Sequence, residues 1–174
     1  MAKKENKKFN WIYIILTTLI IVCLVVIILL VFKNDNTLVP DFAPGTIDTN
    51  AIKEEDKGDK LQASNGGGAV SLAYSNIVAI NNETEEIKMY FKNPSKSRES
   101  IVLQLIIKQN DKEYVLAKSD LLPPGYALYK LKLDSNQKLP KGGYKGVFRA
   151  TYYNEETGTK EIVNTEIEVS IEVS

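Results

Sequence analysis

The stretch LPKGGYKGVFRATYY, residues 139–153, decides how this chain folds. A proline and two glycines precede a tyrosine, which predicts a turn, and an alternating run follows, which predicts a strand. Alternate residues of a strand point to opposite faces. We therefore expect one set to face a core and the other to face outward. The inward set is Tyr144, Gly146, Phe148, Ala150 and Tyr152, and the outward set is Lys145, Val147, Arg149, Thr151 and Tyr153.

Similar runs recur at short intervals between residues 66 and 174, with turn residues between them and no helical period. They predict seven strands, or eight if Ile77–Ile80 is counted. Such spacing is typical of an antiparallel β-sandwich. In the last run, Val163, Thr165, Ile167, Val169, Ile171 and Val173 are expected to face the core, while Asn164, Glu166, Glu168, Ser170 and Glu172 form an acidic outer row beside Lys145 and Arg149.

The turn before the long strand resembles the tyrosine corner of immunoglobulin-like and fibronectin-type domains, in which a tyrosine hydroxyl binds the backbone a few residues upstream. Here the corner would consist of Leu139, Gly142, Gly143 and Tyr144. Both glycines are expected to adopt turn conformations that a side chain would hinder. The resemblance implies an all-β, immunoglobulin-like antiparallel β-sandwich over residues 66–174. The cysteines and the core tryptophan of antibody domains are absent from it.

A long apolar segment lies near the N-terminus. No charged residue occurs from Phe9 to Phe32. Twenty-two residues of helix rise about 33 Å, close to the roughly 30 Å of a bilayer's hydrocarbon core. The segment is longer than a signal-peptide core and no cleavage site follows it. We predict a cytoplasmic basic tail over residues 1–10 and one transmembrane helix over residues 11–33, through which the protein contacts the lipid bilayer.

Charge predicts the orientation of that helix. Four lysines precede the segment, whereas Lys33 alone follows it, so the positive-inside rule places the N-terminus in the cytoplasm and the rest outside. The residues after Lys33 carry 17 basic against 21 acidic side chains. This balance disfavours a nucleic-acid partner. The layout is similar to that of small single-pass surface proteins of Gram-positive bacteria, which implies a cell-membrane location with an extracellular domain.

Residues 34–65 mix polar, charged, Pro and Gly residues without a period, which predicts a flexible extracytoplasmic linker. One island within it, LVPDFAPG at residues 38–45, holds apolar side chains between prolines. It is interpreted either as a stiff spacer or as a docking segment.

The residue inventory argues against an enzyme. The chain contains no histidine, and its one cysteine, Cys23, lies in the apolar segment. The exported part therefore has no disulfide framework, no thiolate–imidazole pair and no usual zinc site. Its paired acids lie beside turns and lack the spacing of a calcium loop. We expect no catalytic residues, no metal and no cofactor.

The outward row of the long strand contains the candidate interaction surface. Together with the strand from Ile101, it would present an apolar patch on one sheet, with Val102, Ile106, Val147, Arg149 and Tyr153 as partner-binding residues. Such a patch is either a partner surface or covered by the linker or a loop. We expect a membrane-anchored interaction or scaffold module of a bacterial cell envelope that binds another envelope component. The alternative is an inhibitor of an extracytoplasmic protease, with the loop Leu121–Gly125 as its inserting element.

Overall fold

The fold is described from a computed structural model of the chain. The described residues are 7–31, 38–54, 56, 59–62, 70–110 and 112–174, with the backbone alone for 7–10, 12, 27–31 and 136. The chain forms two compact units, Met1–Asp35 and Asn36–Ser174. Each unit is described by itself.

The first unit contains one helix, α1, which spans Lys7–Val31. It confirms a helix in the apolar segment, although it begins inside the tail predicted for residues 1–10. Residues 32 and 33 lie outside the described residues. Over the residues that are described, no helix has the length and hydropathy required to cross a membrane.

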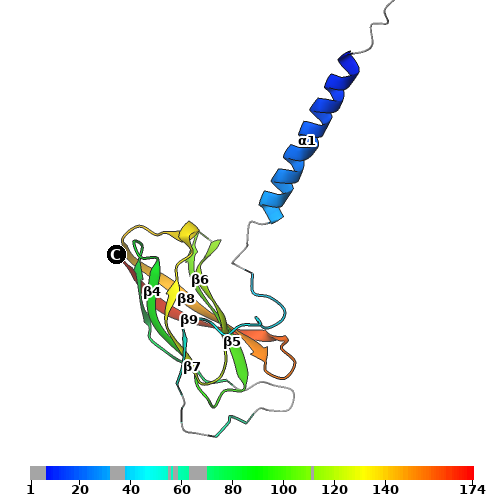
Figure 1. Ribbon diagram of the computed structural model, residues 1–174. Coiled ribbons are helices and arrows are strands. Elements are labelled where there is room, and N and C mark those ends of the chain that lie inside the picture. The colour runs from blue at the N-terminus through cyan, green and yellow to red at the C-terminus, as the bar shows by residue number, and fades with distance from the viewer. Residues whose placement is uncertain (1–6, 32–37, 55, 57–58, 63–69, 111) are drawn as a thin grey trace, which may run out of the picture. The chain divides into compact units, whose positions relative to one another are not determined.

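The described part of the second unit is a single nine-stranded sheet that curls over into two facing layers (Figure 1). A short 3-10 helix, η1, occupies Ser135–Gln137. The strands are β1 (Ala51–Lys53), β2 (Ala73–Tyr74), β3 (Ile77–Asn81), β4 (Glu86–Asn93), β5 (Glu99–Gln109), β6 (Lys112–Leu122), β7 (Tyr126–Lys132), β8 (Gly142–Asn154) and β9 (Lys160–Val173).

The strand order agrees with an immunoglobulin-like sandwich. The sheet runs β1-β7-β4-β3-β9-β8-β5-β6, and β2 pairs with β4. One layer thus has the order D-E-B-A of that fold, and the other has G-F-C with one more strand at its edge. A purely antiparallel sheet was expected. The structure differs in one pair, because β3 pairs in parallel with β9 and joins the two layers.

The edge strand β1 comes from an unexpected part of the sequence. The chain passes from β6 to β7 through the short turn at Pro123–Gly125, so no strand between them fills the D position. Instead β1, from within the predicted linker, pairs antiparallel with β7 and takes that place. The prediction of a structureless linker over residues 34–65 is therefore wrong for this segment.

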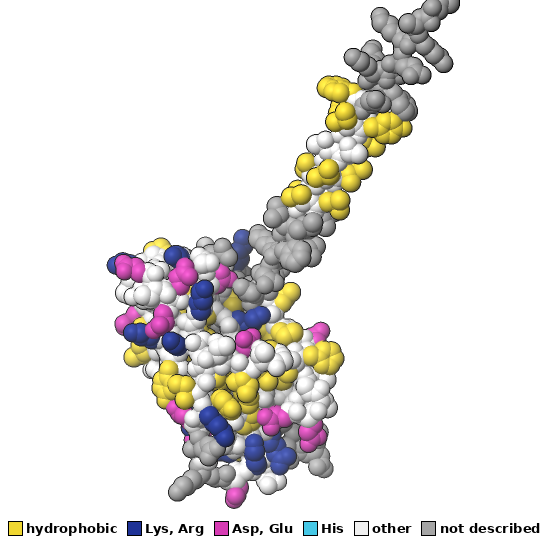
Figure 2. Space-filling view, viewed as in Figure 1, with side chains coloured by type: hydrophobic (Ala, Val, Ile, Leu, Met, Phe, Trp, Pro, Cys, Tyr) yellow, Lys and Arg dark blue, Asp and Glu magenta, His cyan; other side chains and the backbone are white. Residues whose placement is uncertain are grey.

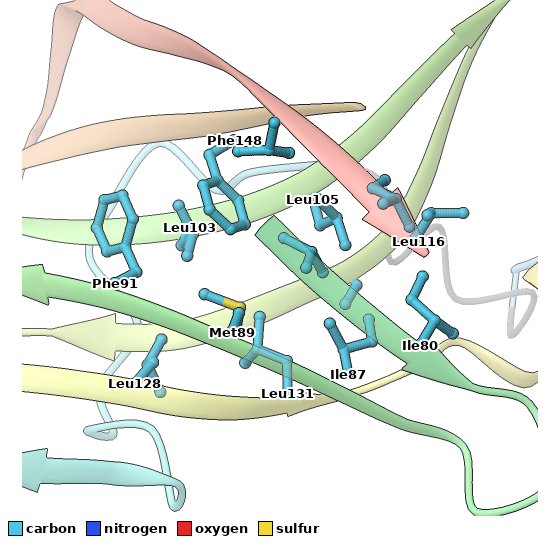
Figure 3. Packing of buried hydrophobic residues seen from close by; sticks show 14 of the residues in the cluster. Ile80, Ile87, Met89, Phe91, Leu103, Leu105, Leu116, Leu128, Leu131 and Phe148 are labelled. Atoms are coloured by element: carbon cyan, nitrogen blue, oxygen red, sulfur yellow. The ribbon is translucent and has the colours of Figure 1, made fainter. Parts of the chain in front are cut away.

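The core lies between the two layers (Figure 3). Phe91 and Met89 of β4 face Phe148 of β8 and Leu103 of β5 across it. The rings of Phe91 and Phe148 meet edge to face, with centroids 5.7 Å apart. Each fully buried side chain of this size stabilises the fold by about 1.5–3 kcal/mol. The predicted inward set of β8 is confirmed, because Phe148, Ala150 and Tyr152 are in this cluster and Tyr144 packs against it.

The tyrosine corner is present. The hydroxyl of Tyr144 donates a hydrogen bond to the carbonyl oxygen of Pro140 at 2.8 Å, and Leu139 packs against the core. Gly142 has a φ of 149°, which L side chains rarely adopt. Gly143 does not have a positive φ, and open space surrounds the position of a Cβ there. The expectation that both glycines are needed for their conformation is wrong for Gly143.

The beginning of β9 departs from the predicted alternation. Its register with β8 shifts between Thr151 and Tyr153, so that three residues of β9 lie opposite Tyr152. Val163 was expected in the core but is 69% exposed, and Ile162 is fully exposed. A bulge of this kind bends a strand and turns side chains away from their regular face.

Candidate interaction surface

The five residues proposed to bind a partner share one face of the sheet. In the register between β5 and β8, Ile106 lies opposite Val147. Val102 on β5, and Arg149 and Tyr153 on β8, lie an even number of residues away and therefore point to the same side. None of the five is in the main core cluster. The sequence thus grouped them correctly on the outer face of this layer.

The exposure predicted for this face is wrong for three of the five residues. Val102, Ile106 and Tyr153 have no exposed surface at all, and Val147 and Arg149 are half-buried. An apolar patch open to a partner therefore does not exist here. Whether these residues bind a partner stays a prediction.

A segment from the predicted linker lies over the Tyr153 end of this face. We call residues 38–61 the strap; of these, 55, 57 and 58 lie outside the described residues. The hydroxyl of Tyr153 donates to the carbonyl oxygen of Pro40 at 2.7 Å. Next to it, the Lys160 amide donates to the carbonyl of Asp41 at 2.9 Å. Burial beneath the strap raises the pKa of Tyr153 to about 12.

The strap then follows the free edge of β6. Ile47 forms a parallel bridge with Leu121, and the amide of Asp48 donates to the carbonyl of Leu121 at 2.9 Å. Asp48 as a whole residue is 7% exposed. Its carboxylate accepts the amide of Asp120 at 2.9 Å and the amide of Asn50 at 2.8 Å. The bond from Asp120 attaches the strap to β6, and the bond from Asn50 lies within the strap. Both have a carboxylate as acceptor, which makes them stronger than neutral hydrogen bonds.

The strap next crosses to the other layer, where β1 pairs with β7. Asp48 holds it to β6 at one edge of the curled sheet, and Ala51–Lys53 holds it to β7 at the other. The strap therefore closes the open side of the sandwich and belongs to the folded domain. The island at residues 38–45 contacts its own domain through backbone hydrogen bonds, while Leu38 and Phe42 are 70% and 67% exposed. Whether it also docks on another protein stays a prediction.

A charged cluster secures the far end of the strap. The ammonium group of Lys92 contacts Glu54 at 3.2 Å and also contacts Asp56, and the hydroxyl of Tyr129 donates to Glu54. Hydrogen bonding to Lys92 holds the pKa of Asp56 below its usual range. The hydrogen bond from Tyr129 does the same for the pKa of Glu54, with a smaller effect from Lys92. Both carboxylates are thus stabilised in their charged forms, which favours a docked strap at neutral pH.

The part of the outer face that the strap leaves open carries an ion network. Arg149 contacts Glu113 at 2.7 Å and Glu166 at 2.6 Å, and Lys108 contacts Glu166 at 2.8 Å. The predicted placement of the acidic row beside Arg149 is confirmed by this pairing. Hydrogen bonding to Arg149 lowers the pKa of Glu113, and hydrogen bonding to Lys108 and then to Arg149 lowers that of Glu166. Such pairs fix strand register more than they add stability.

The loop proposed to enter a protease, Leu121–Gly125, is partly buried. Leu122 has no exposed surface and Gly125 is buried. The strap also bonds to this loop, since the amide of Leu121 donates to Thr46 and the carbonyl of Gly125 accepts the amide of Glu54 at 2.7 Å. The strap thus contacts the loop proposed as an inserting element, and the inhibitor alternative stays a prediction.

One buried carboxylate was missed by the sequence reasoning. Glu99 is 5% exposed, and its Oε2 has no hydrogen-bond partner among the described atoms. Burial, followed by the charges of Glu161 and Glu155, raises its pKa. Within the described residues, no group of three or more potential ligands is arranged to hold a metal ion. A single glutamate at a strand start gives no sequence signal of such burial.

Comparison with known proteins gives little further information. No family model matches the sequence, and no curated protein matches it. Solved structures that resemble it include AggA, the major subunit of aggregative adherence fimbriae type I from Escherichia coli, with 10% identity and a TM-score of 0.34 over 66% of this chain and all of that one. The E. coli chaperone DraB has 8% identity and a TM-score of 0.36, over 61% of this chain and 55% of its own. These values are too low to support an inference about this chain.

Proposed function

We propose that this protein is a membrane-anchored interaction or scaffold module of a bacterial cell envelope. Helix α1 anchors it, and the sandwich is presented on the extracytoplasmic side to another envelope component. The domain acts by binding, and no chemical step is assigned to it.

The exposure of α1 carries the proposal. Every side chain described in this helix is exposed, from Trp11 at 70% to Val26 at 48%, and hydrophobic side chains line the face visible in Figure 2. Exposed large apolar residues occupy four consecutive positions, Leu19–Val22, so they point to all sides of the helix. A helix that is apolar all round is stable only when buried in a protein core or in a bilayer. The uncharged run from Phe9 to Phe32 and the lysines before it favour the bilayer, with the N-terminus inside.

The open part of the outer face favours a polar partner interface. Basic and acidic side chains lie beside hydrophobic ones on the face of the domain visible in Figure 2. With Val102, Ile106 and Tyr153 buried, the open part of the outer face is the network around Arg149. Charged faces of this type contribute to specificity and association rate more than to affinity.

Crosslinking in intact membranes tests the proposal. The full-length chain is compared with a form that ends at residue 37, which lacks the strap as well as the sandwich. We expect a defined envelope protein to be captured by the full-length chain alone. Capture of the same proteins by the short form would assign the specificity to α1 and would contradict the proposed role of the domain.

A further inference from the structure

Strand β9 has an unpaired edge between two occupied ends. At its C-terminal end, Ile77–Ile80 of β3 pairs with Ser170–Val173. At its N-terminal end, the amide of Lys160 donates to the strap at Asp41. Between them, no described strand pairs with the side of β9 that faces away from β8.

The backbone groups on this edge can be assigned from the alternation of the strand. The amide of Ser170 donates to the carbonyl of Asn76, away from β8. In a strand, the N–H and C=O of alternate residues point to the same side. Asn164, Glu166 and Glu168 therefore direct their amides and carbonyls to the open edge. Within the described residues, no backbone partner is found for these amides.

Acidic side chains and apolar side chains both line this edge. On the outer face, Glu166 and Glu168 are exposed, and no described basic group forms an ion pair with Glu168. At the bulge, the apolar side chains of Ile162 and Val163 are fully exposed and 69% exposed, and Ile167 on the inner face is half-buried. A strand added here would meet acids on one face and apolar side chains on the other.

Protection against aggregation does not account for this composition. Proteins guard an edge with charges, often lysine, and with bulges that keep apolar groups from neighbours. Here the bulge has the opposite effect, since it uncovers Ile162 and Val163. Pairing of β9 with β9 of a second copy is also disfavoured, because it would bring glutamates of the two copies together.

We propose that the edge of β9 at residues 164–169 binds an extended segment of a partner protein by strand addition, and that this segment alternates basic and apolar residues. Backbone hydrogen bonds to Asn164, Glu166 and Glu168 supply the register. Basic side chains pair with the acidic row, and apolar ones cover the bulge. The inference rests on the proposed function as an interaction module and names the chemistry of its partner.

A synthetic peptide of seven alternating Lys and Val residues is the probe. It is titrated into the full-length, 15N-labelled chain in detergent micelles, and amide hydrogen exchange is measured with and without peptide. We expect binding with slowed exchange at Asn164, Glu166 and Glu168. Two control peptides, one with Glu in place of Lys and one N-methylated at alternate amides, should bind at least tenfold more weakly. The first tests charge and the second tests backbone pairing.

Two matched variants test the location. Glu168→Lys reverses a charge beside the open edge, and Glu172→Lys reverses one in the same row where β3 already occupies the edge. The first should weaken peptide binding roughly five- to tenfold, and the second should change it less than twofold. The inference would be overturned if the two variants had equal effects, or if the peptide slowed exchange at other residues. It would also be overturned if the N-methylated peptide bound equally well, if the protein dimerised through β9, or if the peptide did not bind at millimolar concentration. If the Glu168→Lys chain captured a partner in membranes as well as the unchanged chain does, the proposed function would stand. Only the inference that the partner binds at the edge of β9 would be rejected.

Discussion

Replacement of Asp48 tests whether the strap is an integral part of the domain. This side chain is almost fully buried and accepts the amides of Asp120 on β6 and Asn50 beside β1. Asp48→Ala removes both acceptors and leaves two backbone donors to find water. The change acts where the strap crosses from one layer to the other.

The expected loss follows from these two bonds. Hydrogen bonds to a charged group contribute about 1.5–3 kcal/mol, and partial access of water to Asn50 offsets part of the loss. We expect the free energy of unfolding to fall by about 2–3 kcal/mol, which corresponds to roughly 5–10 °C in melting temperature. Denaturant unfolding gives the first value. Hydrogen exchange at Ala51–Lys53 and Leu121 should accelerate in parallel.

Asp41→Ala is the matched control, because it removes an aspartate from the same strap. Its ion pair with Lys160 is on the surface, with 86% of the Asp41 side chain exposed. Exposed pairs contribute little, so stability should be unchanged within error. If Asp48→Ala behaved like Asp41→Ala, with no change in unfolding or in exchange at β1, the strap would be an accessory to the domain and our description of its role would be wrong.

Three further predictions concern the core and its border. Glu99→Gln should raise stability at pH 7. The raised pKa means that the folded state binds the proton of Glu99 more tightly than the unfolded chain does. The wild-type protein therefore loses stability as the pH rises from 4.5, the ordinary pKa of glutamate, through the pKa of Glu99 in the folded state. Thermal melts should show that the stability gained by Glu99→Gln at pH 7 disappears below pH 4.5. Gly146→Ala would place a Cβ 2.4 Å from the Cδ1 of Ile171, so it should lower the free energy of unfolding by about 1–3 kcal/mol. The double variant with Ile171→Val, which removes that Cδ1, should lose less stability than the two single variants together. Tyr144→Phe removes the hydroxyl that binds Pro140 and should lower the free energy of unfolding by about 0.5–1.5 kcal/mol, whereas an unchanged value would mean that the corner contributes only packing.

The sandwich could be predicted because each long strand buries one face. In β8, Phe148, Ala150 and Tyr152 face the core. Because successive side chains of a strand alternate, the residues between them must face outward. The acidic row of β9 was predictable for the same reason, and Arg149 pairs with Glu166 as that alternation requires. These features depend on side-chain chemistry, which the sequence displays directly.

The strap could not be predicted in this way, because the backbone makes much of its attachment. Strand β1 has only three residues, too few for a period to be recognised. The bond from Tyr153 to Pro40 joins residues 113 positions apart and involves a carbonyl, which every residue possesses. The buried state of Val102 and Tyr153 was therefore missed, although covering by the linker had been one of the two interpretations. The charged residues of this segment had favoured a flexible linker, whereas Glu54 and Asp56 form ion pairs with Lys92.

Labelling of single cysteines in intact cells tests whether α1 anchors an extracytoplasmic domain. Cys23 is the only cysteine in the chain, so Cys23→Ser gives a clean background. Lys141→Cys is then introduced at an exposed position of the domain, and Lys4→Cys before α1 in a second variant. With a membrane-impermeant maleimide, our account predicts that position 141 reacts in intact cells, that position 4 reacts only after permeabilisation, and that both proteins stay in the membrane after an alkaline wash. Protection of position 141 until lysis, or release of the protein by the wash, would contradict it.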